Sequence, residues 1–154
     1  MNTADLPPVS ELIPHRGRVL LLDRVLTHDV ESTTARVVVN RQAWLRRVDG
    51  SVDGWVAVEY MAQCAATHEG IRALLERRPP VRGSLAGATG VRLHRALFEA
   101  NEKLRIHARR LRGRPGLGMI SHLCSVHEDV ESGDGQLLAE GRLSIAIPKS
   151  DTTS

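Results

Sequence analysis

Two stretches near the N-terminus have apolar patterns that are typical of β-strands. Residues Val19 to Leu26 are almost continuously apolar, which favours a buried strand, whereas residues Thr33 to Val39 alternate between apolar and polar side chains. Residues 29–32 between them form a connection of hairpin length. A short helix is expected earlier, from Ser10 to Ile13, and Pro14 ends it.

The middle of the chain has a helical pattern. From Trp55 to about Arg77 the alternation disappears, and the first three turns are apolar on nearly all sides, which is typical of a buried helix. Ser51 or Asp53 can cap its start, and Pro79 with Pro80 ends it. We therefore expect one long helix inside the fold.

Four more strands are predicted after this helix. They cover residues 81–90, 104–111, 119–127 and 137–147, with turns at 113–116 and 131–135. The first is expected to bend strongly, because three glycines interrupt it. A helix of about 20 residues spans roughly 30 Å, so a sheet that buries it must curl around it. The fold class is therefore α+β, with a curled antiparallel sheet around one central helix.

Length and composition restrict the remaining possibilities. The 154 residues suit a single domain, with a core at about residues 10–148 and flexible termini. No apolar stretch reaches the ~18 residues of a membrane span, and the N-terminus lacks the pattern of a secretory signal. Cys64 and Cys124 have no CxxC spacing, so we expect reduced, buried thiols in a cytoplasmic protein. Seven scattered histidines suggest no metal site.

The net charge of +3 suits nucleic acid, a membrane surface or an acidic protein partner. Nucleic acid is not expected, because the chain lacks an aromatic and basic stacking platform.

Glu59 and Gln63 interrupt the apolar surface of the helix on one face. A buried, unpaired carboxylate is costly, so Glu59 is expected to be used or paired. The alternative is a partly exposed first-turn glutamate that the helix dipole favours. Gly54 lies at the helix start, where free backbone N–H groups can polarise a carbonyl oxygen. A carboxylate beside such donors suits chemistry next to a thioester.

Three segments resemble the 3-hydroxyacyl-(acyl-carrier-protein) dehydratases of fatty-acid synthesis. They are Leu12 to Val25, Val58 to Gln63, and Leu85 to Gly87 followed by Val91 to Arg95. The resemblance covers roughly residues 10 to 148. It implies a hotdog fold, a homodimer with active sites at its interface, and a catalytic role for Glu59. It also implies dehydration of a 3-hydroxyacyl group on the phosphopantetheine arm of an acyl carrier protein, without another cofactor.

One position departs from that family. Its catalytic histidine lies in a loop before the glutamate, where this chain has Leu45, and no histidine occurs between His28 and Glu59. The Gly-Trp helix start and the early Pro-His instead resemble dehydratases of aryl-polyene and related pigment clusters. This subfamily resemblance suggests His15 as the second acid/base group. A structural role is the alternative, because Pro-His-Arg also occurs in relatives whose catalytic histidine lies elsewhere.

The expected site follows from this resemblance. Glu59 and His15 would share the acid and base roles, in an order that the sequence leaves open. The N–H groups of Gly54 and Trp55 would bind the thioester, with Gln63 nearby. An acidic carrier protein would contact a basic surface comprising Arg72, Arg77, Arg78 and Arg82.

Two other functions remain open. A hotdog thioesterase would use the same helix carboxylate to activate water or to attack directly. A non-catalytic subunit would bind acyl chains or support an active hotdog partner in a heterodimer. The acyl chain length and aryl content of the substrate also stay open.

Overall fold

The structure is a computed structural model that describes residues 2–39, 45–79, 83–111 and 118–146. Its helices are α1 (Val9–Leu12) and α2 (Ala57–Leu75), with single 3-10 turns at Thr3–Asp5, Gly17–Val19 and Gly54–Val56. Its strands are β1 (Arg24–His28), β2 (Ser32–Val38), β3 (Val52–Asp53), β4 (Ser84–Leu93), β5 (Leu97–Phe98), β6 (Lys103–Arg110), β7 (Met119–Val130) and β8 (Gly133–Ala146).

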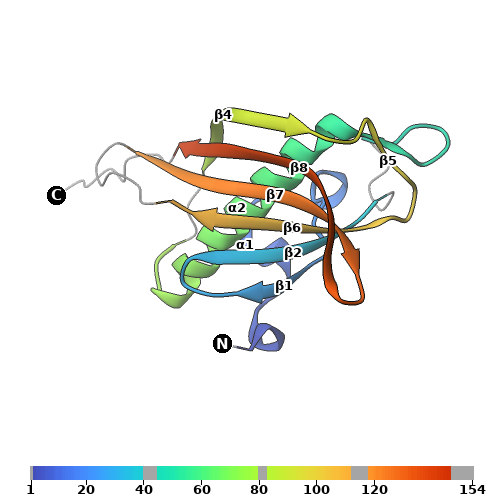
Figure 1. The fold of residues 1–154 in the computed structure, drawn as a ribbon. Helices are drawn as coiled ribbons and strands as arrows, with labels where there is room; N and C mark the ends of the chain where they lie inside the picture. The colour runs from blue at the N-terminus through green and yellow to red at the C-terminus, as the bar shows by residue number, and fades with distance from the viewer. Residues whose placement is uncertain (1, 40–44, 80–82, 112–117, 147–154) are drawn as a thin grey trace.

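A six-stranded sheet curls around α2 (Figure 1). The strand order is β1-β2-β6-β7-β8-β4, and every neighbouring pair is antiparallel. The short strands β3, which precedes α2 in the chain, and β5, which follows β4, form a separate pair. This is the α+β hotdog arrangement that the sequence predicts.

The core lies between α2 and the concave face of the sheet. Leu104, Ile106 and Ala108 on β6 are fully buried, as their alternation predicts, while the residues between them face outward. On α2, Cys64 packs closely enough for its Sγ to lie 3.4 Å from the Ile106 carbonyl oxygen. Burying an aliphatic side chain such as Leu104 or Ile106 contributes about 1.5–3 kcal/mol. This packing holds α2 against the sheet.

Both cysteines are free and buried, as predicted. Burial raises the pKa of Cys64 well above its ordinary value and that of Cys124 to about 12. Both therefore stay protonated at neutral pH and act as small apolar core residues. Among the described helices, none has the length and apolar character that crossing a membrane requires.

The predicted strand from Val19 to Leu26 is only partly correct. The structure begins β1 at Arg24, and the preceding residues form an irregular segment. Leu21 and Leu22 are nevertheless buried, at 6% and 5% exposure. The apolar run therefore reflects burial, which apolar periodicity alone does not distinguish from a strand. The predicted turn at 113–116 lies outside the described residues.

β4 forms one edge of the sheet and is exposed along its length (Figure 1). All of its residues except Val91 are exposed, including Leu85 and Leu93 at 44% each. The register against β8 shifts twice, and Gly90 adopts a φ of 61°, which a glycine accepts readily. The predicted bend of this strand is therefore present as two local irregularities.

Candidate active site

The N-terminal segment crosses the outer side of α2 and brings residues of both together. At one end, Gly70 lets the backbone of α1 approach closely, because a Cβ at Gly70 would lie 2.2 Å from the Leu12 carbonyl oxygen. At the other end, the Gln63 amide accepts a hydrogen bond from Leu21 N at 2.9 Å and donates one to the Val19 carbonyl oxygen at 2.7 Å. These contacts hold the segment against the helix.

His15 lies beside Glu59 within the same chain. Its Nε2 atom is 3.7 Å from Glu59 Oε1, and the two side chains are 26% and 36% exposed. Arg16 holds this part of the chain by donating to the carbonyl oxygens of Ile13 and His15 at 2.6 and 2.8 Å. The distance is longer than a direct hydrogen bond, and catalytic contacts often tighten only when substrate binds. The two residues expected to share the acid and base roles therefore lie side by side, and the catalytic roles themselves stay a prediction.

Gln63 orients Glu59. It is fully buried, and its Nε2 donates to Glu59 Oε1 at 3.0 Å as well as to the backbone of the N-terminal segment. Because both amide protons and the amide oxygen have partners within the chain, Gln63 fixes the carboxylate and the segment that carries His15. The predicted substrate contact by Gln63 remains untested, whereas its contacts here indicate a positioning role.

Gly54 does not offer a free N–H group as expected. Its N–H donates to the Ala96 carbonyl oxygen at 2.8 Å, and a Cβ at this position would lie 2.1 Å from the Arg95 carbonyl oxygen. The glycine therefore lets the strand pair β3–β5 pack against the helix start. Trp55 follows in the first helical turn, where backbone N–H groups lack acceptors within the helix, and its side chain is 57% exposed. Trp55 borders a pocket of about 350 Å³.

The arginines predicted to contact a carrier protein do not form a uniform basic surface. Arg72 contacts Glu69 at 3.1 Å and Glu76 at 3.5 Å, so its charge is largely compensated. Arg78 also pairs with Glu76. Arg77 is exposed at the end of α2 with a φ of 53°, and Arg82 lies outside the described residues. The basic character of this end of the helix therefore rests mainly on Arg77, because Glu76 also offsets part of the Arg78 charge.

Glu69, a second carboxylate on α2, was not among the residues that the sequence predicted to be functional. Its side chain is only 9% exposed and accepts hydrogen bonds from His122 Nε2 and Arg110 Nε, each at 3.0 Å, and from Arg72. Burial alone would raise the pKa of Glu69, but the His122 hydrogen bond and the Arg110 and Arg72 charges outweigh it and lower the pKa to about 2. The sequence did contain one signal for this site, because Glu69 is a charged residue within a helix that was predicted to be buried.

Next to Glu69, a short chain of polar side chains crosses the interior. Thr33 Oγ1 lies 2.8 Å from both His28 Nδ1 and His68 Nδ1. His68 is fully buried, and desolvation lowers its pKa to about 4, against a smaller opposite effect of the Glu69 charge. His68 is therefore neutral at physiological pH and acts as a hydrogen-bonding core residue.

Comparisons with known proteins bear on the family of the chain. A family model described as ApeP-like, ApeP dehydratase, matches residues 7–154. A solved structure described as the dehydratase heterocomplex ApeI:P from Xenorhabdus doucetiae is 24% identical, with a TM-score of 0.83, covering 94% of this chain and 93% of that one. No protein of curated function matches the sequence.

More distant structures share only the fold. A virulence protein from Campylobacter jejuni is 11% identical with a TM-score of 0.64, covering 92% of this chain and 95% of that one. Zebrafish thioesterase superfamily member 2 is 17% identical with a TM-score of 0.59, covering 81% and 80%. These likenesses confirm the hotdog fold and do not favour thioesterase activity. Since the dehydratase family model matches nearly the whole chain, including the segments that carry His15 and Glu59, the chain belongs to the ApeP-like dehydratase family.

Proposed function

We propose that this dehydratase acts on a 3-hydroxyacyl group held as a thioester on an acyl carrier protein, with His15 and Glu59 as its acid/base pair. The observation that supports this most is the 3.7 Å approach of His15 Nε2 to Glu59 Oε1. Histidine titrates near pH 6.5 when unperturbed, which suits proton transfer at neutral pH. Both side chains are partly exposed, so a bound thioester has access to them.

The proposed reaction is a β-elimination. One group of the pair removes the proton from the carbon next to the thioester carbonyl, and electron density moves onto the carbonyl oxygen. The bond between the β-carbon and its hydroxyl oxygen then breaks, the other group protonates the departing oxygen, and a double bond and water form. Trp55 N–H is the proposed donor to the developing enolate oxygen, because the neighbouring Gly54 N–H is already bonded to Ala96.

We also propose that the chain functions in a heterodimer with a second hotdog subunit. The similar structure from Xenorhabdus doucetiae is described as the dehydratase heterocomplex ApeI:P. In this chain, the exposed edge strand β4 presents unpaired backbone groups together with Leu85 and Leu93. Such an edge is suited to pairing with a strand of another chain, so β4 is the proposed contact surface.

The carrier protein is proposed to dock near Arg77 and Arg78 at the end of α2, because carriers of this class are acidic and this chain is basic. The reaction is expected to take place in the cytoplasm. Two buried, free thiols fit a reducing compartment, where cysteines rarely pair.

Mass spectrometry of a carrier-bound 3-hydroxyacyl substrate tests the proposal. The purified chain is incubated with this substrate, alone and together with its candidate partner subunit. Loss of water to give an enoyl thioester supports dehydration. Release of a free acid and a thiol would instead identify a thioesterase. His15→Ala is expected to lose most turnover while keeping its circular dichroism spectrum. Normal turnover of His15→Ala would contradict the assigned pair, and turnover that depends only on the partner would identify a non-catalytic subunit.

A further inference from the structure

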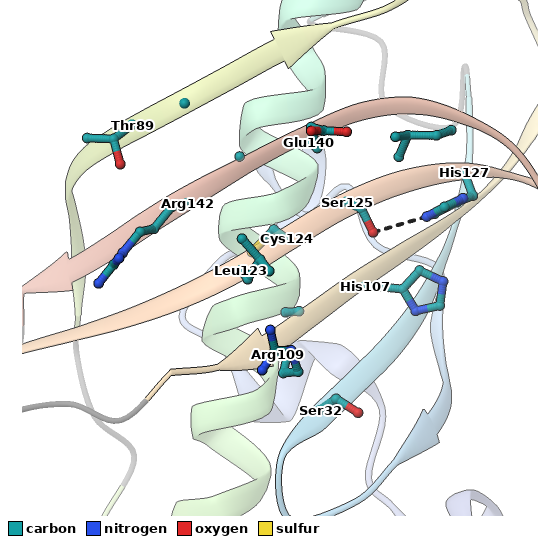
Figure 2. Close-up of a pocket in the computed structure, with 14 residues that line it drawn as sticks. Ser32, Thr89, His107, Arg109, Leu123, Cys124, Ser125, His127, Glu140 and Arg142 are labelled. Atoms are coloured by element: carbon teal, nitrogen blue, oxygen red, sulfur yellow. Dashed lines mark hydrogen bonds between the residues drawn. The ribbon is translucent and has the colours of Figure 1, made fainter.

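A groove of about 760 Å³ crosses the outer face of the sheet, on the side away from α2 (Figure 2). His107 and His127 lie together at one end of it, whereas Arg109 and Arg142 lie toward the other end (Figure 2). Neither histidine contacts the proposed acid/base pair. The groove therefore presents chemistry that dehydration does not use.

Three side chains from adjacent strands meet at the histidine end. His107 comes from β6, His127 from β7 and Asp134 from β8, and one ligand atom of each lies within 4.8 Å of the others. His107 Nε2 is 2.9 and 3.0 Å from the two Asp134 oxygens. The imidazole rings are 5.2 Å apart and nearly perpendicular, at 80°. Because β6, β7 and β8 are neighbours in one sheet, the backbone holds these three groups rigidly in place.

The groups behind the histidines favour this orientation. Without a metal, His107 Nε2–H donates to Asp134, whose carboxylate can only accept. Thr34 Oγ1 lies 2.7 Å from His107 Nδ1, so when a cation replaces the Nε2 proton, Nδ1 can carry the proton and donate it to Thr34. A hydrogen bond to the other ring nitrogen is how proteins commonly orient a metal-binding histidine. His127 Nδ1 is buried and, within the described part of the chain, has no hydrogen-bond partner, while Nε2 lies 3.2 Å from Ser125 Oγ.

Arg105 is a cation that lies close to this cluster. Arg105 NH1 is 3.7 Å from Asp134 Oδ1, but its Nε lies closer, at 3.2 Å, to Asp129 Oδ1. Asp129 is mostly buried, at 8% exposure, and also pairs with Arg36 at 2.8 Å. Arg105 is therefore held mainly by Asp129. Asp134 is 41% exposed and keeps oxygen lone pairs available for another cation.

From these contacts we propose that His107, His127 and Asp134 form a binding site for a divalent transition-metal ion, with Zn²⁺ as the best match. Two imidazoles and one carboxylate are a ligand set typical of Zn²⁺ sites, in which a fourth position remains open to water or another ligand. Mg²⁺ and Ca²⁺ prefer oxygen ligands throughout and fit less well. The fourth position would face the groove. This inference is independent of the proposed dehydration, because it involves other residues on the opposite side of the sheet.

Zn²⁺ titration of the protein tests the site. Tag-free protein is stripped with a chelator and titrated calorimetrically at about pH 7.5, above the ordinary histidine pKa of about 6.5. One Zn²⁺ per chain is expected, with affinity at least about tenfold weaker in His127→Ala and Asp134→Asn. His94→Ala is the matched control, because His94 is an exposed histidine that also faces a carboxylate, Glu140 at 3.5 Å, and should bind Zn²⁺ like the wild type.

Three results would contradict the proposed Zn²⁺ site. The site would be overturned if the wild type did not bind Zn²⁺, or if His127→Ala and Asp134→Asn bound it with the affinity of the wild type. His107 would then be a structural bridge between Thr34 and Asp134. If a variant fails to fold, the histidine ring signals in NMR spectra of the wild type decide the question. Zn²⁺ should shift those of His107 and His127, and an unchanged pair of signals would refute the proposal.

Discussion

Helix α2 carries two glutamates ten residues apart, Glu59 and Glu69, and each lies beside a histidine. Glu69 is buried and receives hydrogen bonds from His122, Arg110 and Arg72 at 3.0 to 3.1 Å. Glu59 is 36% exposed, lies 3.7 Å from His15 and is held by a single amide donor from Gln63. The hydrogen-bonding capacity of the carboxylate is therefore largely used at Glu69 and only partly used at Glu59.

This difference separates a structural carboxylate from a candidate catalytic one. Every strong donor around Glu69 stabilises its charged form and leaves it little tendency to exchange protons near neutral pH. Glu59 keeps acceptor positions open toward solvent and toward His15, so a substrate can enter its surroundings. Burial and charge alone would have pointed to Glu69 as the functional group. The number of unfilled hydrogen-bond positions points to Glu59 instead.

The largest effect is expected at Glu59. Glu59→Gln retains a partner for Gln63 and should keep the fold, but it removes the group that transfers protons. Turnover of the carrier-bound substrate should fall by about 10²–10⁴-fold, the usual contribution of general acid–base catalysis. Glu131→Gln, on the exposed turn between β7 and β8, is the control. A Glu59→Gln rate above half that of the wild type would remove Glu59 from the mechanism.

The converse effect is expected at Glu69. Glu69→Gln leaves buried donors facing a neutral amide, so the free energy of unfolding should fall by about 3 kcal/mol, while turnover per folded molecule stays near that of the wild type. Urea denaturation measures the loss. Glu76→Gln, an exposed change just after the end of α2, should cost less than about 0.5 kcal/mol. A loss below about 1 kcal/mol at Glu69 would contradict its structural role.

Acid should destabilise the protein through His68. Its pKa is lowered from 6.5 to about 4 in the folded state, so between these values the unfolded chain binds a proton that the folded chain does not. The free energy of unfolding should therefore fall by about 2–3 kcal/mol as pH decreases from 6.5 to 4. The measurement is the slope of stability against pH for the wild type and for His68→Gln. An equally steep slope in the variant would show that other groups cause the effect.

A smaller effect should sharpen the role of Gln63. In Gln63→Leu, Glu59 loses its amide donor, and the Val19 and Leu21 backbone groups lose their partner. If Gln63 positions Glu59, kcat should fall by about tenfold with little change in KM, as expected for a group that acts through the catalytic carboxylate. A raised KM with unchanged kcat would instead support the substrate contact predicted from the sequence.

The smallest effect concerns carrier docking. Arg77→Glu combined with Arg78→Glu should slow association with the carrier protein several-fold at low salt and less at high salt, because exposed charges mainly steer association. Stopped-flow binding at two ionic strengths measures this. The control reverses two exposed charges elsewhere, Arg24→Glu with Arg109→Glu, for an equal change in net charge. Equal association rates for both double variants would exclude this surface.

Patterns along the chain predicted much of the fold. The buried helix and the alternation of β6 follow directly from local side-chain periodicity, and the structure confirms both. The motif around Glu59 and the Pro-His at His15 also pointed to a pair that lies together in the structure. These predictions depended on short-range periodicity or on a resemblance spanning the chain, which require no knowledge of strand register.

Features that depend on long-range contacts were missed. The Glu69–His122 hydrogen bond joins residues 53 positions apart, and its existence depends on how β7 packs against α2. His107, His127 and Asp134 looked like scattered residues, because only the alignment of three strands brings them together. Gly54 was expected to serve a ligand, but the distant Ala96 uses its N–H. Spacing along the chain carries no information about such encounters.

If the proposed partner subunit pairs with the open edge of β4, the stability of this protein depends on the concentration of that subunit. A subunit that binds only the folded chain adds RT ln(1 + [L]/Kd) to its unfolding free energy, about 2.7 kcal/mol when the partner is present at a hundred times its Kd. Chains produced in excess over the partner would lack this contribution and expose an unpaired strand to one another. Balanced synthesis of the two subunits would therefore protect the enzyme from aggregation as well as assemble it.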